Sequence, residues 1–186
     1  MSSINPPAPL VDWTLRLEDA SVLDRPVRLI GPEIEALFGS GLRGSLLRGD
    51  WLGHAVHPVL TDFVLGSWTS ATVLDVFGGP ESASSARKLV GAGLLVVGPT
   101  AWTGWAQWSG SELRDKRVGL VHAATNGLAA GIYAASWIAR RRGSHSAGAG
   151  LAVAGAAVAG VGGYLGGHLA SARHVGSRDA AYADTD

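Results

Sequence analysis

Four long apolar stretches follow one another through the last two-thirds of the chain. They cover about residues 58–77, 89–108, 118–139 and 148–170, and short polar connections separate them. Each has about 20 residues, and at about 1.5 Å of rise per residue such a helix spans a hydrocarbon core of about 30 Å. Short connections place consecutive helices side by side in opposite directions. The pattern therefore predicts an all-α integral membrane protein, folded as a four-helix up-down-up-down bundle.

The first 50 residues follow a different pattern. Residues 1–10 are rich in Pro, which predicts a disordered start, and residues 11–50 alternate charged and apolar side chains. The segment LRGSLLRGDWLG, residues 42–53, sets leucines beside arginines, as in amphipathic helices that lie on a membrane; a solvated loop is the alternative. We expect three parts: an N-terminal extension over residues 1–50, a transmembrane domain over residues 51–170 and a polar tail over residues 171–186.

The composition limits the chemistry that the chain can support. Only 16% of the residues are charged and the formal net charge is zero, so nucleic-acid binding has no electrostatic basis. The absence of Cys excludes disulfides, thiolate metal sites and thiolate-held iron–sulfur clusters in this chain, and Met1 is the only Met. Histidine remains as the residue type suited to bind a transition metal or a haem iron.

Four histidines stand at ends of apolar stretches that an up-down bundle brings to one membrane face. His57 opens the first stretch, His122 lies about five residues into the third, and His168 lies about two residues before the end of the fourth. At about 1.5 Å per residue, His122 and His168 then lie within about one helical turn of the same depth. His54 precedes His57 by three residues, in the entry loop. Ionisable side chains in such segments are costly and indicate a functional site.

Three further side chains belong to this neighbourhood. Asn126 follows His122 by four residues and shares its helix face. Asp62 lies about one turn deeper than His57 on the same helix. Trp105 belongs to a group of tryptophans at the end of the second stretch, and these either pack against a cofactor or anchor the helices at the membrane interface.

Three hypotheses fit the histidine cluster. In the first, which we favour, the cluster binds a redox cofactor, b-type haem or a quinone, for electron transfer. The residues expected to bind this cofactor are His54, His57, His122, His168, Asn126 and Trp105. In the second, a zinc-dependent membrane hydrolase holds its metal with His57, His122, His168 and Asp62. In the third, the protein is a cofactor-free structural or assembly subunit, and the Gly-rich fourth helix is its partner surface.

The chain also resembles a known family of bacterial membrane proteins. The resemblance rests on three segments in order: WLGHAVHPVLTDFVLGSWTSATVLD, GLVHAATNGLAAGIYAASWIARRRG and GYLGGHLA. Together they resemble the family catalogued as domain of unknown function 2231, whose hallmark G-H-x-x-H-P is matched by Gly53, His54, His57 and Pro58. The similarity covers roughly residues 45–175. It implies a four-helix membrane unit but no established activity.

The resemblance also implies a redox partner. Actinobacterial members of that family often carry a following Rieske-type iron–sulfur domain, and this Cys-free chain contains no such cluster. We therefore expect an iron–sulfur protein or another membrane redox subunit as the partner, and the bilayer as the immediate environment.

Basic residues give a prediction for orientation. Seven lie on the expected histidine face and five on the other, so the positive-inside rule favours cytoplasmic termini in a multi-pass protein of the bacterial inner or plasma membrane. The seven are Arg43, Arg48, Arg114, Lys116, Arg117, Arg173 and Arg178, and the five are Arg87, Lys88, Arg140, Arg141 and Arg142.

Overall fold

The computed structural model describes residues 7–176 and 178–185, and no β-strand occurs in this part of the chain. The expected all-α class is therefore confirmed. The start that we expected to be disordered falls partly on residues 1–6, outside the described residues, and the chain is helical from Pro9 onward. The α-helices of the described residues are α1 (Pro9–Glu18), α2 (Asp24–Ile34), α3 (Gly41–Arg48), α4 (His57–Phe77), α5 (Ala83–Ser109), α6 (Leu113–Arg141) and α7 (His145–Gly167).

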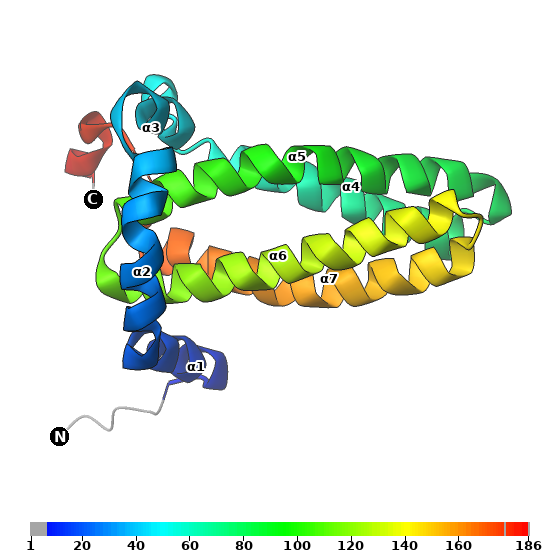
Figure 1. Cartoon of the computed structure of the whole chain (residues 1–186), viewed down its shortest axis with the longest axis horizontal. Coiled ribbons are helices and arrows are strands. Elements are labelled where there is room, and N and C mark those ends of the chain that lie inside the picture. Colours follow the sequence, from blue (N-terminus) through cyan, green and yellow to red (C-terminus); the bar gives the residue numbers. More distant parts are fainter. Residues whose placement is uncertain (1–6, 177, 186) are drawn as a thin grey trace.

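The four long helices, α4 to α7, lie along one common direction and form two antiparallel hairpins (Figure 1). Helix α4 packs along α5, and α6 packs along α7, while α5 also contacts α6 and α4 contacts α7. After α7 the chain continues as a π-helical turn, His168–Ala172. The four helices thus surround a shared interior.

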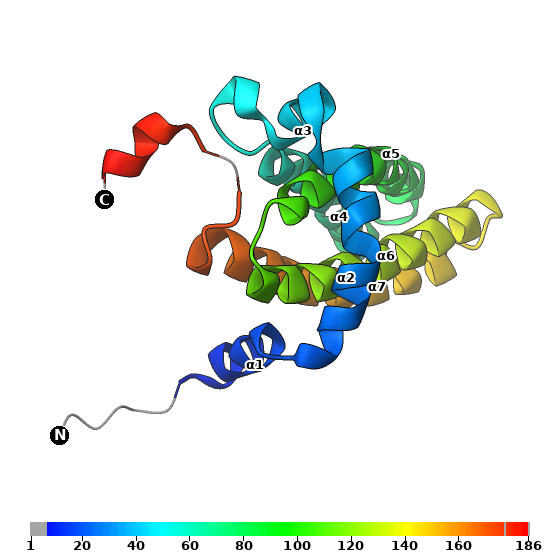
Figure 2. The ribbon, with the colours of Figure 1, turned by 60° about the vertical axis from the view of Figure 1, so that its left-hand side comes forward.

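The three N-terminal helices lie across one end of the long helices, near the connection between α5 and α6 (Figures 1 and 2). Helix α1 packs against α6, α2 contacts both α5 and α6, and α3 contacts α5. A stacked pair, with ring centroids 6.1 Å apart, joins Trp13 of α1 to Tyr164 of α7. The N-terminal segment is therefore fixed to the end at which α4 and α6 begin.

A glycine-dependent turn determines where α4 starts. Gly49 and Gly53 have φ angles of 85° and 80°, in the left-handed region that side chains with a Cβ disfavour. A Cβ on Gly49 would also clash with the carbonyl oxygen of His54. Pro58 in the first turn of α4 suits a position whose N–H has no helical partner. The turn places His57 at the helix start, inside the end covered by the N-terminal helices.

The long helices are apolar outside and partly polar inside. Val59, Phe63, Val73, Leu95, Leu128, Ile138, Val153 and Val161 are among the exposed apolar side chains. Ser67, Thr103, Ser136 and Arg140 are buried between the helices. Two helical stretches of the described residues are long and apolar enough to cross a membrane, Pro80–Ser109 and His145–Ala172. Helices α4 and α6, which contribute much of the interior polarity, are not among them.

The two hairpins repeat one another. Tyr133 of α6 occupies the position of Trp68 in α4, and their rings stack across the interior with centroids 3.8 Å apart. Each ring packs against a glycine of its own hairpin, Trp68 against Gly93 and Tyr133 against Gly155. Tyr133 follows Trp68 by 65 positions, and Gly155 follows Gly93 by 62. An approximate two-fold axis along the helices therefore relates α4–α5 to α6–α7.

The same axis relates a buried ion pair nearer the opposite end. Arg140 follows Asp75 by the same 65 positions, and its guanidinium donates two hydrogen bonds to the Asp75 carboxylate. Arg140 is 1% exposed and also donates to the hydroxyl of Ser136, which in turn donates to Gly148 O. Equivalent positions of α4 and α6 thus meet across the axis at more than one level.

Candidate functional site

His57, the first residue of α4, is held by α5. Its Nδ1 lies 2.9 Å from the carbonyl oxygen of Thr100 and 3.2 Å from the hydroxyl of Thr103. Because a carbonyl oxygen can only accept, Nδ1 carries the proton and donates it. The hydroxyl of Thr61 donates to the His57 carbonyl at 2.9 Å and comes only to 3.5 Å from Nε2. The lone pair of His57 Nε2 is therefore available to a ligand.

His122 of α6 is held by α7 in the same way. Its Nδ1 donates to the carbonyl oxygen of Gly162 at 2.9 Å. The side-chain amide nitrogen of Asn126 donates to the His122 carbonyl at 3.0 Å and lies 3.2 Å from Nδ1 and 3.3 Å from Nε2 of the ring. His122 therefore has the same tautomer as His57, and Asn126 lies against its ring, at the position that Thr61 has in the other hairpin.

The two imidazoles face one another across the two-fold axis. Their centroids are 6.4 Å apart and their planes make an angle of 72°. Each ring rests on a glycine of the flanking helix, because a Cβ on Gly104 would lie 2.9 Å from Cε1 of His57, and a Cβ on Gly166 would lie 2.9 Å from Cε1 of His122. Each glycine thus leaves a space for one imidazole, which we call its slot. Gly166 follows Gly104 by 62 positions, so the two slots are equivalent.

A cavity of about 340 Å³ lies beside this pair. Trp68 lines it at the deep end, and Gln107, Ser111 and Asp115 line it nearer the end covered by the N-terminal helices. The rest of the lining is mostly apolar and includes Val64, Leu65, Val97, Trp105 and Trp108, with the polar Thr61, Thr100 and Asn126 near the two histidines. The cavity therefore offers a largely apolar interior, two imidazoles and a polar end at Gln107, Ser111 and Asp115, which we call its mouth.

The histidine pair has the bonding pattern of imidazoles that ligate a metal. Such imidazoles donate one ring N–H to a carbonyl or carboxylate, which fixes the tautomer and leaves the other nitrogen as the ligand. Within the part of the chain that the structure describes, no group of three or more His, Cys, Asp or Glu side chains is arranged to hold a metal ion. The site thus supplies two nitrogen donors, one from each hairpin.

Of the other residues expected at the site, Asn126 and Trp105 line the cavity, and Trp105 meets Trp108 edge to face with centroids 5.4 Å apart. His54 is exposed, with Nδ1 3.3 Å from Ala55 O, and forms an isolated β-bridge with Arg178. Asp62 is exposed on the outer face of α4. Neither His54 nor Asp62 lines the cavity beside the pair.

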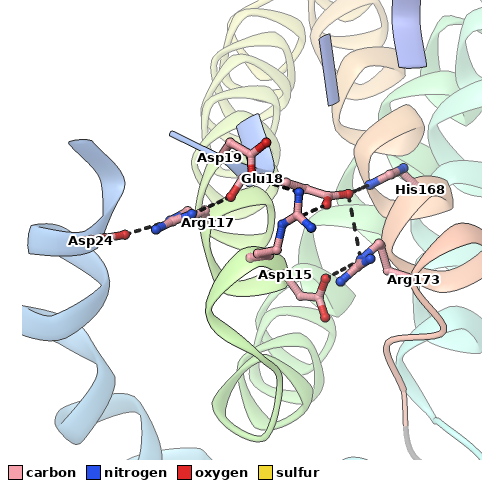
Figure 3. Close-up of polar contacts among 8 residues, drawn as sticks. Glu18, Asp19, Asp24, Asp115, Arg117, His168 and Arg173 are labelled. Atoms are coloured by element: carbon pink, nitrogen blue, oxygen red, sulfur yellow. Dashed lines mark hydrogen bonds and ion pairs between the residues drawn. The ribbon is translucent and has the colours of Figure 1, made fainter. Parts of the chain in front are cut away.

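His168, the first residue of the π-helical turn, has a different partner (Figure 3). Its Nε2 lies 2.8 Å from Oε1 of Glu18 in α1, a carboxylate that is 1% exposed. Arg114 and Arg173 lie within 3.4 Å and 3.8 Å of the same carboxylate. His168 therefore helps to fix the N-terminal segment and does not join His57 and His122.

Further ion pairs hold this end together (Figure 3). Arg173 donates to Asp115 at 2.7 Å, and this hydrogen bond raises the pKa of the guanidinium. Arg117 donates to Asp24 at 2.7 Å and to the carbonyl oxygen of Glu18 at 2.6 Å. The hydrogen bond from Arg117 holds the pKa of the Asp24 carboxyl below its usual value. Asp115, which lines the cavity, is thus paired with a cation, and the neighbouring pairs hold the N-terminal helices to α6.

Sequence reasoning missed the groups that orient the two rings. Thr100 and Gly162 supply the carbonyl acceptors, and Gly104 and Gly166 supply the slots. The sequence does contain a signal for them. The segments GLLVVGPTAWTG, residues 93–104, and GAAVAGVGGYLG, residues 155–166, share glycines at their first, sixth and last positions. An alignment of these two segments is sufficient to pair Gly104 with Gly166.

Comparison with known proteins is consistent with this helical membrane architecture. Searches of curated proteins and of solved structures found no match. One family model does match, over residues 53–179, and its members are described as predicted membrane proteins. This match includes α4 to α7 with both histidines of the pair, and excludes α1 to α3. Because it covers more than half of the chain, the protein belongs to the family of predicted membrane proteins catalogued as domain of unknown function 2231.

Proposed function

We propose that this protein is an integral membrane electron-transfer unit that binds one b-type haem between His57 and His122. The observation that carries the proposal is the pair itself. Two imidazoles from equivalent positions have the same tautomer, with each Nδ1–H donated to a backbone carbonyl, and face one another across the axis. Haem iron ligated by two histidines takes up and releases one electron without a change of ligands.

The separation of the rings supports a single ion between them. A metal–imidazole bond is about 2.0–2.1 Å long, and each nitrogen lies roughly 1 Å from its ring centre, so two rings bound to one ion have centres roughly 6 Å apart. The observed separation is 6.4 Å. The apolar cavity beside the rings, with Trp68 and Trp105 in its walls, suits a macrocycle that packs against aromatic side chains.

The apolar outer surface of the four long helices supports a lipid environment for them. Helix α4 has 21 residues, about 31 Å at the usual rise per residue, and the other three long helices are longer. Exposed residues along all four are largely apolar, and the polar residues that lower the hydropathy of α4 and α6 lie inside. We therefore propose that α4 to α7 all cross the bilayer as a four-helix bundle in the bacterial inner membrane.

The N-terminal helices then lie at the membrane surface. Leu29, Leu42 and Leu46 are exposed, and arginines accompany them in the sequence. The basic residues counted from the sequence favour the cytoplasmic side for this end, with both termini. An electron donor or acceptor would approach here. An iron–sulfur protein is the partner that we propose, since this chain has no Cys to hold such a cluster itself.

An absorption spectrum of the detergent-purified full chain, expressed with ample haem, tests the proposal. We expect a Soret band and a reversible shift of that band on reduction. His57→Ala and His122→Ala should each lose six-coordinate haem. His145 is exposed at the start of α7, so the control variant His145→Ala should bind haem as the native protein does. A colourless protein that folds normally would overturn the haem assignment.

The same sample distinguishes the other hypotheses. Bound zinc in elemental analysis, lost in both His57→Ala and His122→Ala, would favour the hydrolase. A quinone that copurifies with colourless protein would favour the quinone version of the redox hypothesis. Protein without metal, haem or quinone, whose histidine variants lose only stability, would favour the structural subunit.

A further inference from the structure

An unpaired amide lies in the cavity wall near its mouth. Nε2 of Gln107 in α5 is buried and has no hydrogen-bond partner among the described residues. A buried donor without an acceptor is costly, so such groups usually meet a ligand or an ordered water. Gln107 lies one turn beyond Gly104, the residue on which the His57 ring rests. The free donor is therefore within one helical turn of the histidine level, on the side of the mouth.

We infer that Gln107 donates this hydrogen bond to a propionate of the haem, whose carboxylate edge points to the mouth of the cavity. The inference rests on the proposed function and adds the orientation of the ligand and a residue that selects for its carboxylate. A haem bound between two rings on a two-fold axis can place its carboxylate edge toward either end of that axis. The two ends of the cavity differ in polarity, and this difference decides between them.

The deep end suits a carboxylate poorly. Trp68, which stacks on Tyr133, lines this end, and Val64 and Val97 line the walls there. The single donor of the Trp68 indole is already given to the carbonyl oxygen of Val90. A carboxylate placed at that end would lose its hydration, and the nearest side-chain donors, the Thr61 hydroxyl and the Asn126 amide, already donate to the carbonyl oxygens of His57 and His122.

The mouth offers a donor and a neutralised charge. Besides the Gln107 amide, Ser111 and Asp115 line this end. The Asp115 carboxylate is paired with Arg173 at 2.7 Å, so it does not act as an isolated negative charge toward a propionate. The carboxylate edge therefore points to the same end as the N-terminal helices.

The two-fold repeat is broken at this position. The residue equivalent to Gln107 is Leu169, 62 positions later in the π-helical turn after α7, and it lines the same cavity without any side-chain donor. One wall of the mouth is thus polar and the other is apolar. Gln107 is then a specificity-determining residue for one carboxylate group, and the other propionate extends toward the surface.

Titration of the apo full-length protein with haem and with haem dimethyl ester, which lacks free carboxylates, tests the inference. For the native protein we expect the ester to bind about tenfold to a hundredfold more weakly, the effect of one charge-assisted hydrogen bond. Gln107→Leu should lower haem affinity by a similar factor while changing ester affinity little. Gln107→Glu, nearly the same size but negatively charged, should lower haem affinity further.

The outcomes separate this inference from the proposed function. If the native protein binds neither haem nor the ester, the proposed function fails. If the native protein shows the Soret band but Gln107→Leu binds haem with native affinity, Gln107 contacts only water and the inference is wrong. The comparison of haem with its ester on the native protein needs no variant, so equal affinities would also overturn the inference if the variants did not fold.

Discussion

Adding one methyl group at Gly166 should displace His122 from its position in the pair. The Cβ of Gly166→Ala would lie 2.9 Å from Cε1 and 3.3 Å from Nδ1 of the ring. Carbon atoms prefer separations of about 3.5–4.0 Å, so the ring would have to retreat by roughly 0.6 Å. The ring cannot simply swing aside, because its Nδ1 donates to the carbonyl oxygen of Gly162 one turn earlier on the same helix.

The size of this shift decides the expected effect. Metal–ligand distances in a functional site tolerate deviations of about 0.2 Å, well below the displacement that the methyl group requires. Overpacking of this kind costs about 1–3 kcal/mol, which corresponds to roughly fivefold to more than a hundredfold in affinity. Replacing Gly by Ala within a helix also gains up to about 1 kcal/mol, but this gain stabilises the fold with and without haem and leaves the loss of haem affinity unchanged.

Titration of apo-protein with haem measures this loss, with Gly160→Ala as the matched control. Gly160 lies on the same helix and has nothing within 4 Å of its ideal Cβ, so that variant should keep native affinity and gain slightly in stability. Gly104→Ala should reproduce the Gly166→Ala effect through His57, because its Cβ would lie 2.9 Å from that ring. Native affinity in both Gly104→Ala and Gly166→Ala would refute the role that we give to the two slots.

Three other predictions concern the ion pairs. Asp75→Ala leaves the buried Arg140 charge unpaired and should destabilise the fold by about 3–5 kcal/mol, measured by thermal or denaturant unfolding. The double variant Asp75→Arg with Arg140→Asp exchanges the two charges between equivalent positions and should recover part of this stability. The folded-state pKa of Asp24 is lowered, so the carboxylate stabilises the fold fully above its unfolded pKa of about 4, and this stabilisation is lost as pH falls through the folded-state pKa. Proteolysis of the N-terminal segment should therefore become faster at low pH, and this increase should be smaller in Asp24→Asn. Glu18→Gln should free α1, measured as faster hydrogen exchange over Pro9–Glu18, without shifting the Soret band.

The sequence was most informative about elements whose signal is local. Runs of about 20 apolar residues separated by polar connections predicted four long helices, and α4 to α7 correspond to these runs. His57 and His122 were both expected near one end because helix direction and residue spacing determine depth. Their ring positions could not be derived in the same way, because they depend on the glycines and carbonyl groups of a neighbouring helix.

His168 shows why depth alone was insufficient. Its place near the end of the fourth apolar run suggested a third member of the cluster. The structure pairs it instead with Glu18, which is 150 positions earlier in a helix whose packing the sequence pattern did not specify. Ion pairs between distant segments carry no periodic signal, and nothing in the sequence pattern specified where the N-terminal segment packs. Zinc ligation by three histidines and Asp62 stays a prediction, without support from the placement of these groups.

The internal repeat explains which residues can face one another on the axis. At three levels a position of α4 meets its own equivalent in α6, so the two residues must be compatible as a pair. Aromatic rings satisfy this as similar residues, Trp68 with Tyr133. Charged residues cannot be of the same sign at equivalent positions, because two like charges about 4 Å apart repel by about 4 kcal/mol even at an effective dielectric constant of 20. At this level the repeat instead places Asp75 opposite Arg140.

The histidine level follows a different rule. His57 and His122 are identical, although imidazoles facing one another gain nothing from being identical when no ligand lies between them. An ion coordinated equally from both sides does require the same donor atom at the same distance on each side. The two hairpins also supply identical supports at this level, a carbonyl acceptor for each Nδ1–H and a glycine under each ring. The repeat therefore keeps its symmetry most strictly where a ligand on the axis would need it.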